Sequence, residues 1–189
     1  MCGRFSLTII LSLLEQQTGK KAPEHYKPSY NIAPSQNIVV DTGDELSWMK
    51  WGYQPEWAKK GVINAQLEGV FEKPFWKHAK RCVIIADGFY EWKAGTKKIP
   101  YRITPDALFA FAAVYDEKTR TVAIVTTAAD KVMQPVHHRM PVMLPLDKIQ
   151  SWIEDGKPKP LASKKLRMYP ISDAVNNPRN NSKELLAEV

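Results

Sequence analysis

The residue with the most distinctive chemistry is Cys2, because it directly follows the initiator methionine. Removal of Met1 ahead of this small side chain would leave an amine and a thiol on adjacent carbons. An α-amine with a reference pKa of about 7.7–8.0 attacks an aldehyde at neutral pH, and the sulfur can then close on the iminium to form a thiazolidine ring. The alternative is an incidental cysteine near a frayed terminus.

The segment after Cys2 favours the functional interpretation. Gly3 permits a close backbone approach, Arg4 offers a planar fork for a phosphate, and Phe5 can anchor the segment in the core. These properties predict a chain start that is held in place.

Glu91 is a second candidate, because it stands in the strand-like run RCVIIADGFYEWK. Alternation along a strand places Phe89 and Glu91 on one face and Tyr90 and Trp92 on the other. Aromatic neighbours would desolvate Glu91 and raise its pKa, which suits proton transfer at neutral pH. The alternative is a solvated glutamate on an edge strand.

His137 is a third candidate, in the segment VHHRMPVML. In an extended chain His137 and Arg139 share a face, and His138 points the other way. The histidine could exchange protons and the arginine could hold a phosphate. The alternative is a histidine pair that serves packing or loop hydrogen bonds.

Weaker signals come from an amide, from tryptophans and from the second cysteine. Asn64 in INAQLEG can both donate and accept hydrogen bonds. Trp51 and Trp57 in WGYQPEW could stack exposed bases, although tryptophans more often lie in a core. Cys82 is interpreted as a buried, inert strand residue.

Composition limits the class of protein. The 189 residues fit a single domain spanning 1–189, and a composition of 44% hydrophobic and 25% charged residues argues against a disordered chain. A formal charge of +7 is compatible with a polyanionic partner. The two cysteines lack metal-ligand spacing, and the N-terminal apolar run lacks the order of a signal peptide. We therefore expect a cytoplasmic protein without a membrane segment.

Most of the chain is predicted to form strands. A short helix is expected first, capped by Ser6 or Thr8 and ended by Gly19. Its predicted buried face comprises Leu7, Ile10, Leu11 and Leu14. HYKPSYNIAPSQ is expected to be a loop that leads into an NIVVD strand.

Strand-like runs then continue to about residue 172, with short turns that favour antiparallel pairing. Further helices are expected at KPFWKHAK, LDKIQSWIEDG and SKELLAEV. The predicted fold is α+β, a single domain with a predominantly antiparallel, curved or barrel-like sheet flanked by short helices.

Six motifs, taken in order, resemble the SRAP family, the SOS response-associated peptidases. They are MCGRF, YNIAPSQ, WGYQPEW, INAQLEG, GFYEW and HHRMPVML, and the resemblance extends to YPISDAVNNP near the C-terminus. It implies a groove for single-stranded DNA and a self-processing step that exposes Cys2. It also implies covalent capture of the ring-opened aldehyde of an abasic site.

The resemblance also assigns residues. Cys2 matches the nucleophile, Asn64 the asparagine that orients it, Glu91 the acid of the YEW motif and His137 the histidine of the H-x-R-M-P motif. The positions implied to line or support the DNA groove are Arg4, Pro34, Trp57, Gln66, Arg81 and Arg139. Gln66 is a departure, because the family pattern reads N-A-R here; we expect weaker and less salt-sensitive DNA binding.

The resulting hypothesis is an autopeptidase that crosslinks itself to abasic single-stranded DNA as a monomer, without a metal or organic cofactor. In it Glu91 and His137 move protons and Asn64 holds the N-terminus. One alternative is a cysteine peptidase that acts on other proteins. Another is a reversible single-stranded nucleic-acid-binding module. A metal site of His137, His138 and Glu91 is disfavoured, because adjacent strand residues point apart.

Overall fold

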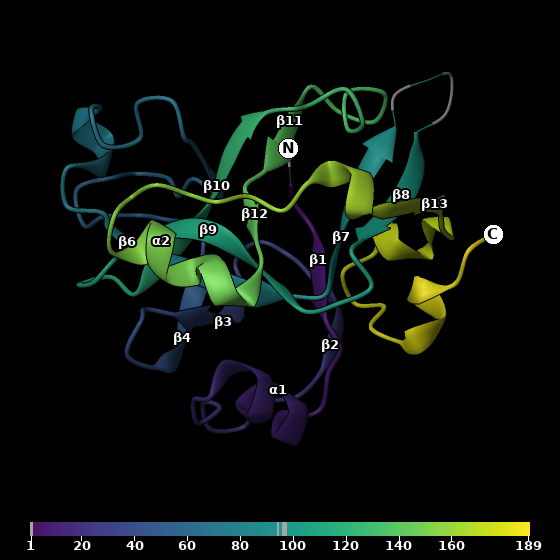
Figure 1. Cartoon of the computed structure of the whole chain (residues 1–189), viewed down its shortest axis with the longest axis horizontal. Helices are drawn as coiled ribbons and strands as arrows, with labels where there is room; N and C mark the ends of the chain where they lie inside the picture. The colour runs from purple at the N-terminus through teal and green to yellow at the C-terminus, as the bar shows by residue number, and fades with distance from the viewer. Residues whose placement is uncertain (1, 94, 96–97) are drawn as a thin grey trace.

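The computed structural model describes residues 2–93, 95 and 98–189, and strands dominate it (Figure 1). In chain order the elements, with η for a 3-10 helix, are β1 (Phe5–Leu7), α1 (Leu11–Thr18), β2 (Ser29–Ile32), β3 (Asn37–Asp41), β4 (Leu46–Trp51), β5 (Asn64–Gln66), η1 (Pro74–Trp76), β6 (Lys80–Ala86), β7 (Gly88–Lys93), β8 (Ile99–Thr104), β9 (Phe109–Asp116), β10 (Thr121–Ala128), β11 (Arg139–Pro141), β12 (Met143–Leu144), η2 (Leu146–Lys148), α2 (Ile149–Ile153), η3 (Ser163–Lys165), β13 (Arg167–Pro170), η4 (Asp173–Asn176) and η5 (Lys183–Leu186).

Within the described residues the strands form two sheets. The smaller has the order β13-β8-β7-β1-β2. The larger has eight strands, and β10, β4, β3, β6 and β9 close into a ring because β9 also pairs with β10. Pairing is antiparallel except where β10 meets β4 and β5. The predicted α+β class with a barrel-like, mostly antiparallel sheet is therefore confirmed.

The main core lies inside this ring. Every residue of β9 is buried, which explains why its sequence FAFAAVYD shows no alternation of apolar and polar residues. Helix α2 covers β6 and β9 from outside. Its Trp152 is fully buried and donates a hydrogen bond from Nε1 to the carbonyl of Cys82, at 2.9 Å. Cys82 is buried as predicted.

The sequence predicted a single strand for the run RCVIIADGFYEWK, and this prediction is wrong. The run divides between β6 in the larger sheet and β7 in the smaller one, with Asp87 at the junction. The predicted alternation holds within β7. Phe89 packs in the main core, whereas Tyr90 and Trp92 pack in a second cluster with Val175.

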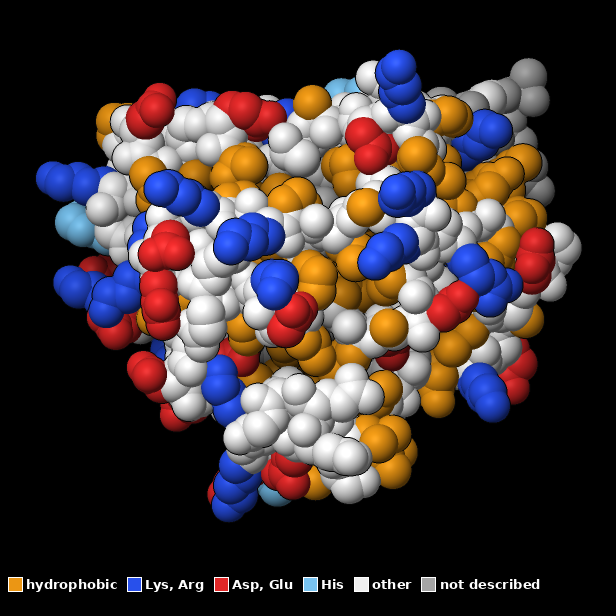
Figure 2. All heavy atoms as spheres, in the orientation of Figure 1, with side chains coloured by type: hydrophobic (Ala, Val, Ile, Leu, Met, Phe, Trp, Pro, Cys, Tyr) orange, Lys and Arg blue, Asp and Glu red, His pale blue; other side chains and the backbone are white. Residues whose placement is uncertain are grey.

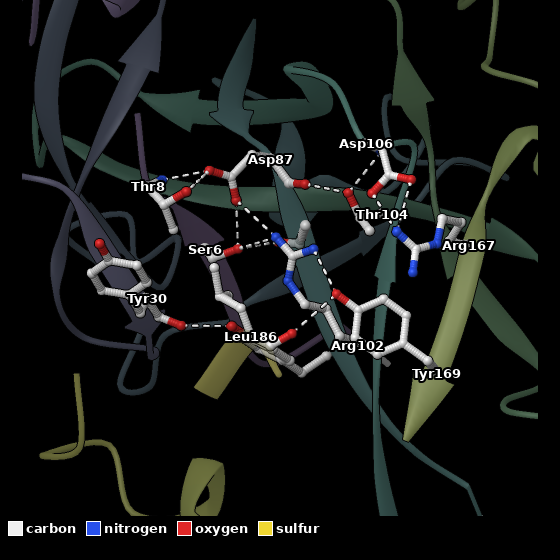
Figure 3. A network of polar contacts seen from close by, with 12 residues as sticks. Ser6, Thr8, Tyr30, Asp87, Arg102, Thr104, Asp106, Arg167, Tyr169 and Leu186 are labelled. Atoms are coloured by element: carbon white, nitrogen blue, oxygen red, sulfur yellow. Dashed lines mark hydrogen bonds and ion pairs between the residues drawn. The ribbon is translucent and has the colours of Figure 1, made fainter. Parts of the chain in front are cut away.

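Asp87 joins the smaller sheet through a buried polar network (Figure 3). Its carboxylate accepts hydrogen bonds from Ser6 Oγ at 2.6 Å and Thr8 Oγ1 at 2.7 Å, and it pairs with Arg102 at 3.4 Å. Thr104 Oγ1 donates to its backbone carbonyl at 2.7 Å. Because these partners come from β1, its following residues and β8, the network holds β1 in register against β7.

The first helix begins later than predicted. Leu7 ends strand β1, and α1 starts at Leu11 after Ile10, without a side-chain cap from Ser6 or Thr8. Ile10 and Leu11 are exposed, so the predicted apolar face is wrong apart from Leu14. A tertiary strand pairing outweighed the local helical pattern here. Gly19 does end the helix, with a left-handed φ of 68°.

Of the other predicted secondary-structure elements, some are confirmed and some are wrong in part. HYKPSYNIAPSQ is not wholly a loop, because Ser29–Ile32 forms β2 and pairs with β1. The NIVVD strand and the helix in LDKIQSWIEDG are confirmed, and KPFWKHAK and SKELLAEV contain short 3-10 helices. Among the described residues, no helix has the length and apolar character that crossing a bilayer requires.

Candidate functional site

Strands β1 and β7 bring the start of the chain to Glu91. Their antiparallel register pairs Phe5 with Phe89, and the backbone N–H of Tyr90 donates to the carbonyl of Arg4 at 2.9 Å. Continued toward the N-terminus, this register carries Cys2 to the end of β7 that holds Glu91. Cys2 is 0% exposed and Glu91 only 3%, so the alternatives of a frayed terminus and a solvated edge glutamate are wrong.

Asn64 holds the backbone of Cys2. Strand β5 runs parallel to β10, and the side-chain Nδ2 of Asn64 donates to the carbonyl oxygen of Cys2 at 3.0 Å. The Oδ1 atom of Asn64 is buried without a hydrogen-bond partner among the described residues. We call Cys2, Asn64 and Glu91 the inner site.

Burial governs the acid–base properties of the inner site. It raises the pKa of the Cys2 thiol well above its ordinary value, and the negative charge of Glu91 adds to the shift. Burial also raises the pKa of the Glu91 carboxyl. The sulfur is therefore a protonated thiol at neutral pH rather than a preformed thiolate. Met1 lies outside the described residues.

His137 lies in the same pocket as Glu91. His137 Nδ1 lies 2.9 Å from the backbone nitrogen of Arg139 and 3.1 Å from the Arg139 carbonyl. In the neutral ring with its proton on Nε2, Nδ1 accepts the hydrogen bond from the Arg139 N–H. Burial lowers the pKa of His137 below its ordinary value. The ring stacks on His138 with centroids 4.4 Å apart, so the expectation that His138 points away is wrong. The two histidines precede β11, and His138 lies in a bend.

Three pocket residues were missed by the sequence reasoning as site residues: Trp92, Lys98 and Asn176. The indole Nε1 of Trp92 donates to Asn176 Oδ1 at 2.7 Å. Asn176 lies in the YPISDAVNNP motif, which was noted only for the resemblance. Nothing in its spacing indicates that it reaches Glu91, because the C-terminal segment arrives there through tertiary packing.

Arg4 has partners inside the protein. Its guanidinium donates to Asn31 Oδ1 at 2.8 Å and to the Val175 carbonyl at 2.6 Å. Asn31 Nδ2 in turn lies within hydrogen-bonding distance of the carbonyls of Val175, Asn177 and Asn180. The Arg4 guanidinium also lies 5.9 Å from the centroid of the Trp92 ring. These contacts fasten the chain start to the C-terminal segment, and a DNA contact of Arg4 remains a prediction.

Three further residues implied to line or support the DNA groove each lie in a different part of the fold: Arg81, Trp57 and Pro34. Arg81 donates from Nε to the Ile153 carbonyl at 2.9 Å and so caps the C-terminal end of α2. Trp57 is 62% exposed, packs edge-on against Phe75, and lines a groove that shares no lining residue with the Glu91 pocket. Pro34 is half-buried between β2 and β3. Their DNA contacts remain predictions.

A second group of polar residues lies beside Asn64 at the surface. Gln66 is exposed at the end of β5 and shares the face of Asn64 by alternation. Arg139 forms a bidentate ion pair with Glu68, at 3.1 and 2.8 Å. We call Gln66, Glu68 and Arg139 the rim. Figure 2 shows basic and acidic side chains interspersed over the face it presents, with no large area of a single sign.

This geometry defines a class of protein: an α+β fold with a barrel-like sheet, in which a buried cysteine at position 2 lies beside an asparagine and a glutamate, and a histidine shares the pocket of that glutamate. The chain belongs to the SRAP family, because the family model "SOS response associated peptidase (SRAP)" matches residues 1–178. In the described part of the chain, no three His, Cys, Asp or Glu side chains gather as metal ligands would.

Similar proteins agree with this membership. The chain is 38% identical to the abasic site processing protein YoaM of Bacillus subtilis, over 98% of this chain and 97% of that protein. It is 30% identical to the abasic site processing protein YedK of Escherichia coli, over the full length of both. A crystal structure of a Bacteroides thetaiotaomicron protein has the same fold, with a TM-score of 0.83 and 22% identity over all of both chains.

Proposed function

We propose that this protein captures abasic sites in single-stranded DNA by bonding covalently through Cys2. The observation that carries the proposal is the inner site, in which a buried Cys2 lies beside Glu91 while Asn64 holds its carbonyl. Its relatives are named abasic site processing proteins, which supports the choice of lesion. An abasic site in its ring-opened form presents the aldehyde that an aminothiol attacks.

The first step is removal of Met1, which frees the α-amine of Cys2. The same inner site supports a self-processing reaction, in which the peptide bond after Met1 is hydrolysed and methionine leaves. Asn64 keeps the new N-terminus in place through its hydrogen bond to the Cys2 carbonyl. A held nucleophile lowers the entropic cost of reaction.

The amine then acts before the sulfur. The Nε2–H of a neutral His137 can donate a hydrogen bond to the ring oxygen of the sugar, and the proton of the anomeric hydroxyl passes to that oxygen as the ring opens to the aldehyde. The amine adds to the aldehyde carbon, Glu91 donates a proton to the resulting hydroxyl, and loss of water leaves an iminium. The thiol adds to that carbon, its proton passes to Glu91, and the thiazolidine ring closes. A protonated thiol is a weaker nucleophile than a thiolate. The raised pKa of Cys2 therefore suits an order in which the strongly electrophilic iminium forms before the sulfur attacks.

A cysteine peptidase acting on other proteins is less well supported. Such an enzyme needs a thiolate with a lowered pKa near a basic group. Here burial and Glu91 raise the pKa of Cys2 instead. A reversible binding module has no need of a buried acid beside the chain start.

The test compares one protein before and after its N-terminus is freed. A removable N-terminal extension is cleaved to expose Cys2, and intact mass confirms both forms. With abasic single-stranded DNA, the cleaved form should give an adduct that survives denaturation, and the uncleaved form should give none. Equal adduct from both forms would refute the proposal. An intact oligonucleotide is the control.

Three parts of the proposal need their own measurement. Abasic lesions in single and double strands should differ in adduct yield, with the single strand favoured. Size-exclusion chromatography should show a monomer. Fractionation should find the protein in the cytoplasm with the nucleoid.

A further inference from the structure

The arginine of the rim is already occupied by a carboxylate. Arg139 donates from both terminal nitrogens to the two oxygens of Glu68, and also to the Thr126 carbonyl at 2.8 Å. Thr127 Oγ1 donates to Glu68 at 3.2 Å and steadies it. A phosphate would need the same fork of the guanidinium that Glu68 uses. Phosphate binding at Arg139 therefore requires Glu68 to leave.

Exposure decides which partner a polyanion meets first. The side chain of Glu68 is 53% exposed, whereas that of Arg139 is only 14% exposed. The hydrogen bond from Arg139 holds the pKa of Glu68 down to about 2, so Glu68 is negatively charged at neutral pH. DNA approaching this rim encounters the carboxylate before the guanidinium.

The rest of the rim does not compensate for this charge. Gln66 is exposed at the end of β5 and is uncharged. With Arg139 and Glu68 of opposite sign, the rim is formally neutral in a chain whose net charge is +7. The rim itself therefore contributes none of the net positive charge of the protein.

We propose that Glu68 competes with the DNA phosphate for Arg139 and keeps reversible binding to intact strands weak. The inference rests on the proposed covalent capture. An intact strand offers no aldehyde, so it displaces Glu68 briefly and dissociates. A strand with an abasic site is retained by its bond to Cys2. Glu68 in this way makes retention on DNA depend on the lesion.

The test measures reversible binding of an intact labelled oligonucleotide by fluorescence anisotropy at several salt concentrations. Glu68→Gln should bind about tenfold more tightly at low salt, and its affinity should fall more steeply with salt, by about 0.7 in the log–log slope. Asp106→Asn is the matched control, because it also removes the carboxylate of an exposed ion pair with arginine, Arg167 at 3.3 Å. It should change the affinity less than about twofold.

A double variant identifies the group that gains the phosphate. The increase should disappear in Glu68→Gln/Arg139→Gln, because the freed guanidinium is then absent. Binding by Glu68→Gln that is no tighter than that of Asp106→Asn overturns the inference, as does an increase that persists in the double variant. Thermal melting checks folding, and Glu68→Ala replaces Glu68→Gln if the latter does not fold.

A different experiment, on abasic strands, tests the proposed function independently of the role of Glu68. A wild-type protein that forms no denaturation-resistant adduct with an abasic strand refutes covalent capture. The comparison on intact strands would still report whether Glu68 competes for Arg139.

Discussion

The inner site and the rim adjoin on β5, yet they are built in opposite ways. Asn64 and Gln66 lie two residues apart on one face of the strand, but Asn64 is buried against Cys2 whereas Gln66 is exposed. The inner site shifts the pKa values of Cys2 and Glu91 upward through burial. The rim holds opposite charges at the surface, where a ligand can exchange with them. Chemistry and reversible DNA binding should therefore be separable by mutation.

The largest expected effect is the loss of the stable adduct in Cys2→Ala. When its N-terminus is freed by cleavage of a removable extension, this variant keeps the α-amine of residue 2, so it should still form an iminium with the abasic aldehyde. Without the sulfur the ring cannot close, and the adduct should survive denaturation only after borohydride reduction. Gel electrophoresis with and without reduction measures both species. A stable unreduced adduct would show that another residue supplies the bond.

Glu91→Gln should slow adduct formation by about 100-fold, because a positioned proton-transfer group typically contributes at least that much. The amide keeps the size of the side chain and removes its ability to exchange a proton. Single-turnover kinetics on an abasic strand measure the rate. Reversible affinity for an intact strand should be unchanged, and a parallel loss of affinity would contradict the separation from the rim.

The pH dependence should report the amine of Cys2. An α-amine with a pKa of about 7.7–8.0 is reactive only when deprotonated, so the rate should rise about tenfold per pH unit below that range and then level off. Burial lowers the pKa of His137, so its ring is already neutral at pH 7 and does not set this midpoint. His137→Gln should lower the rate and leave the midpoint in place. A shifted midpoint would assign the titration to His137 instead.

The smallest effect is expected from Gln66→Arg. An added guanidinium at the rim should strengthen binding to intact single strands a few-fold and steepen the salt dependence by about 0.7. The rate of adduct formation at saturating DNA should not change. Gln150→Arg on α2 is a matched control with the same charge change at an exposed position. If both variants strengthen binding equally, the rim does not contact DNA.

Much of the site could be predicted from local chemistry. The alternation around Phe89, Glu91 and Trp92 predicted which side chains share a face, because strand geometry is regular over a few residues, but it left open whether Glu91 is desolvated or solvated. The helix near the N-terminus was placed wrongly because Leu7 fits a helical face as well as it fits a strand. Pairing of β1 with β2 and β7 decided between them.

The sequence by itself determined which side chains are available: a thiol at Cys2, a carboxyl at Glu91 and an imidazole at His137, since these follow from residue type and order. Only the tertiary structure decided how they act, since burial and partners depend on contacts between distant segments. It brought Asn176 of the C-terminal segment into the Glu91 pocket and paired Arg139 with Glu68. The charge that a residue presents depends on the neighbours that folding supplies.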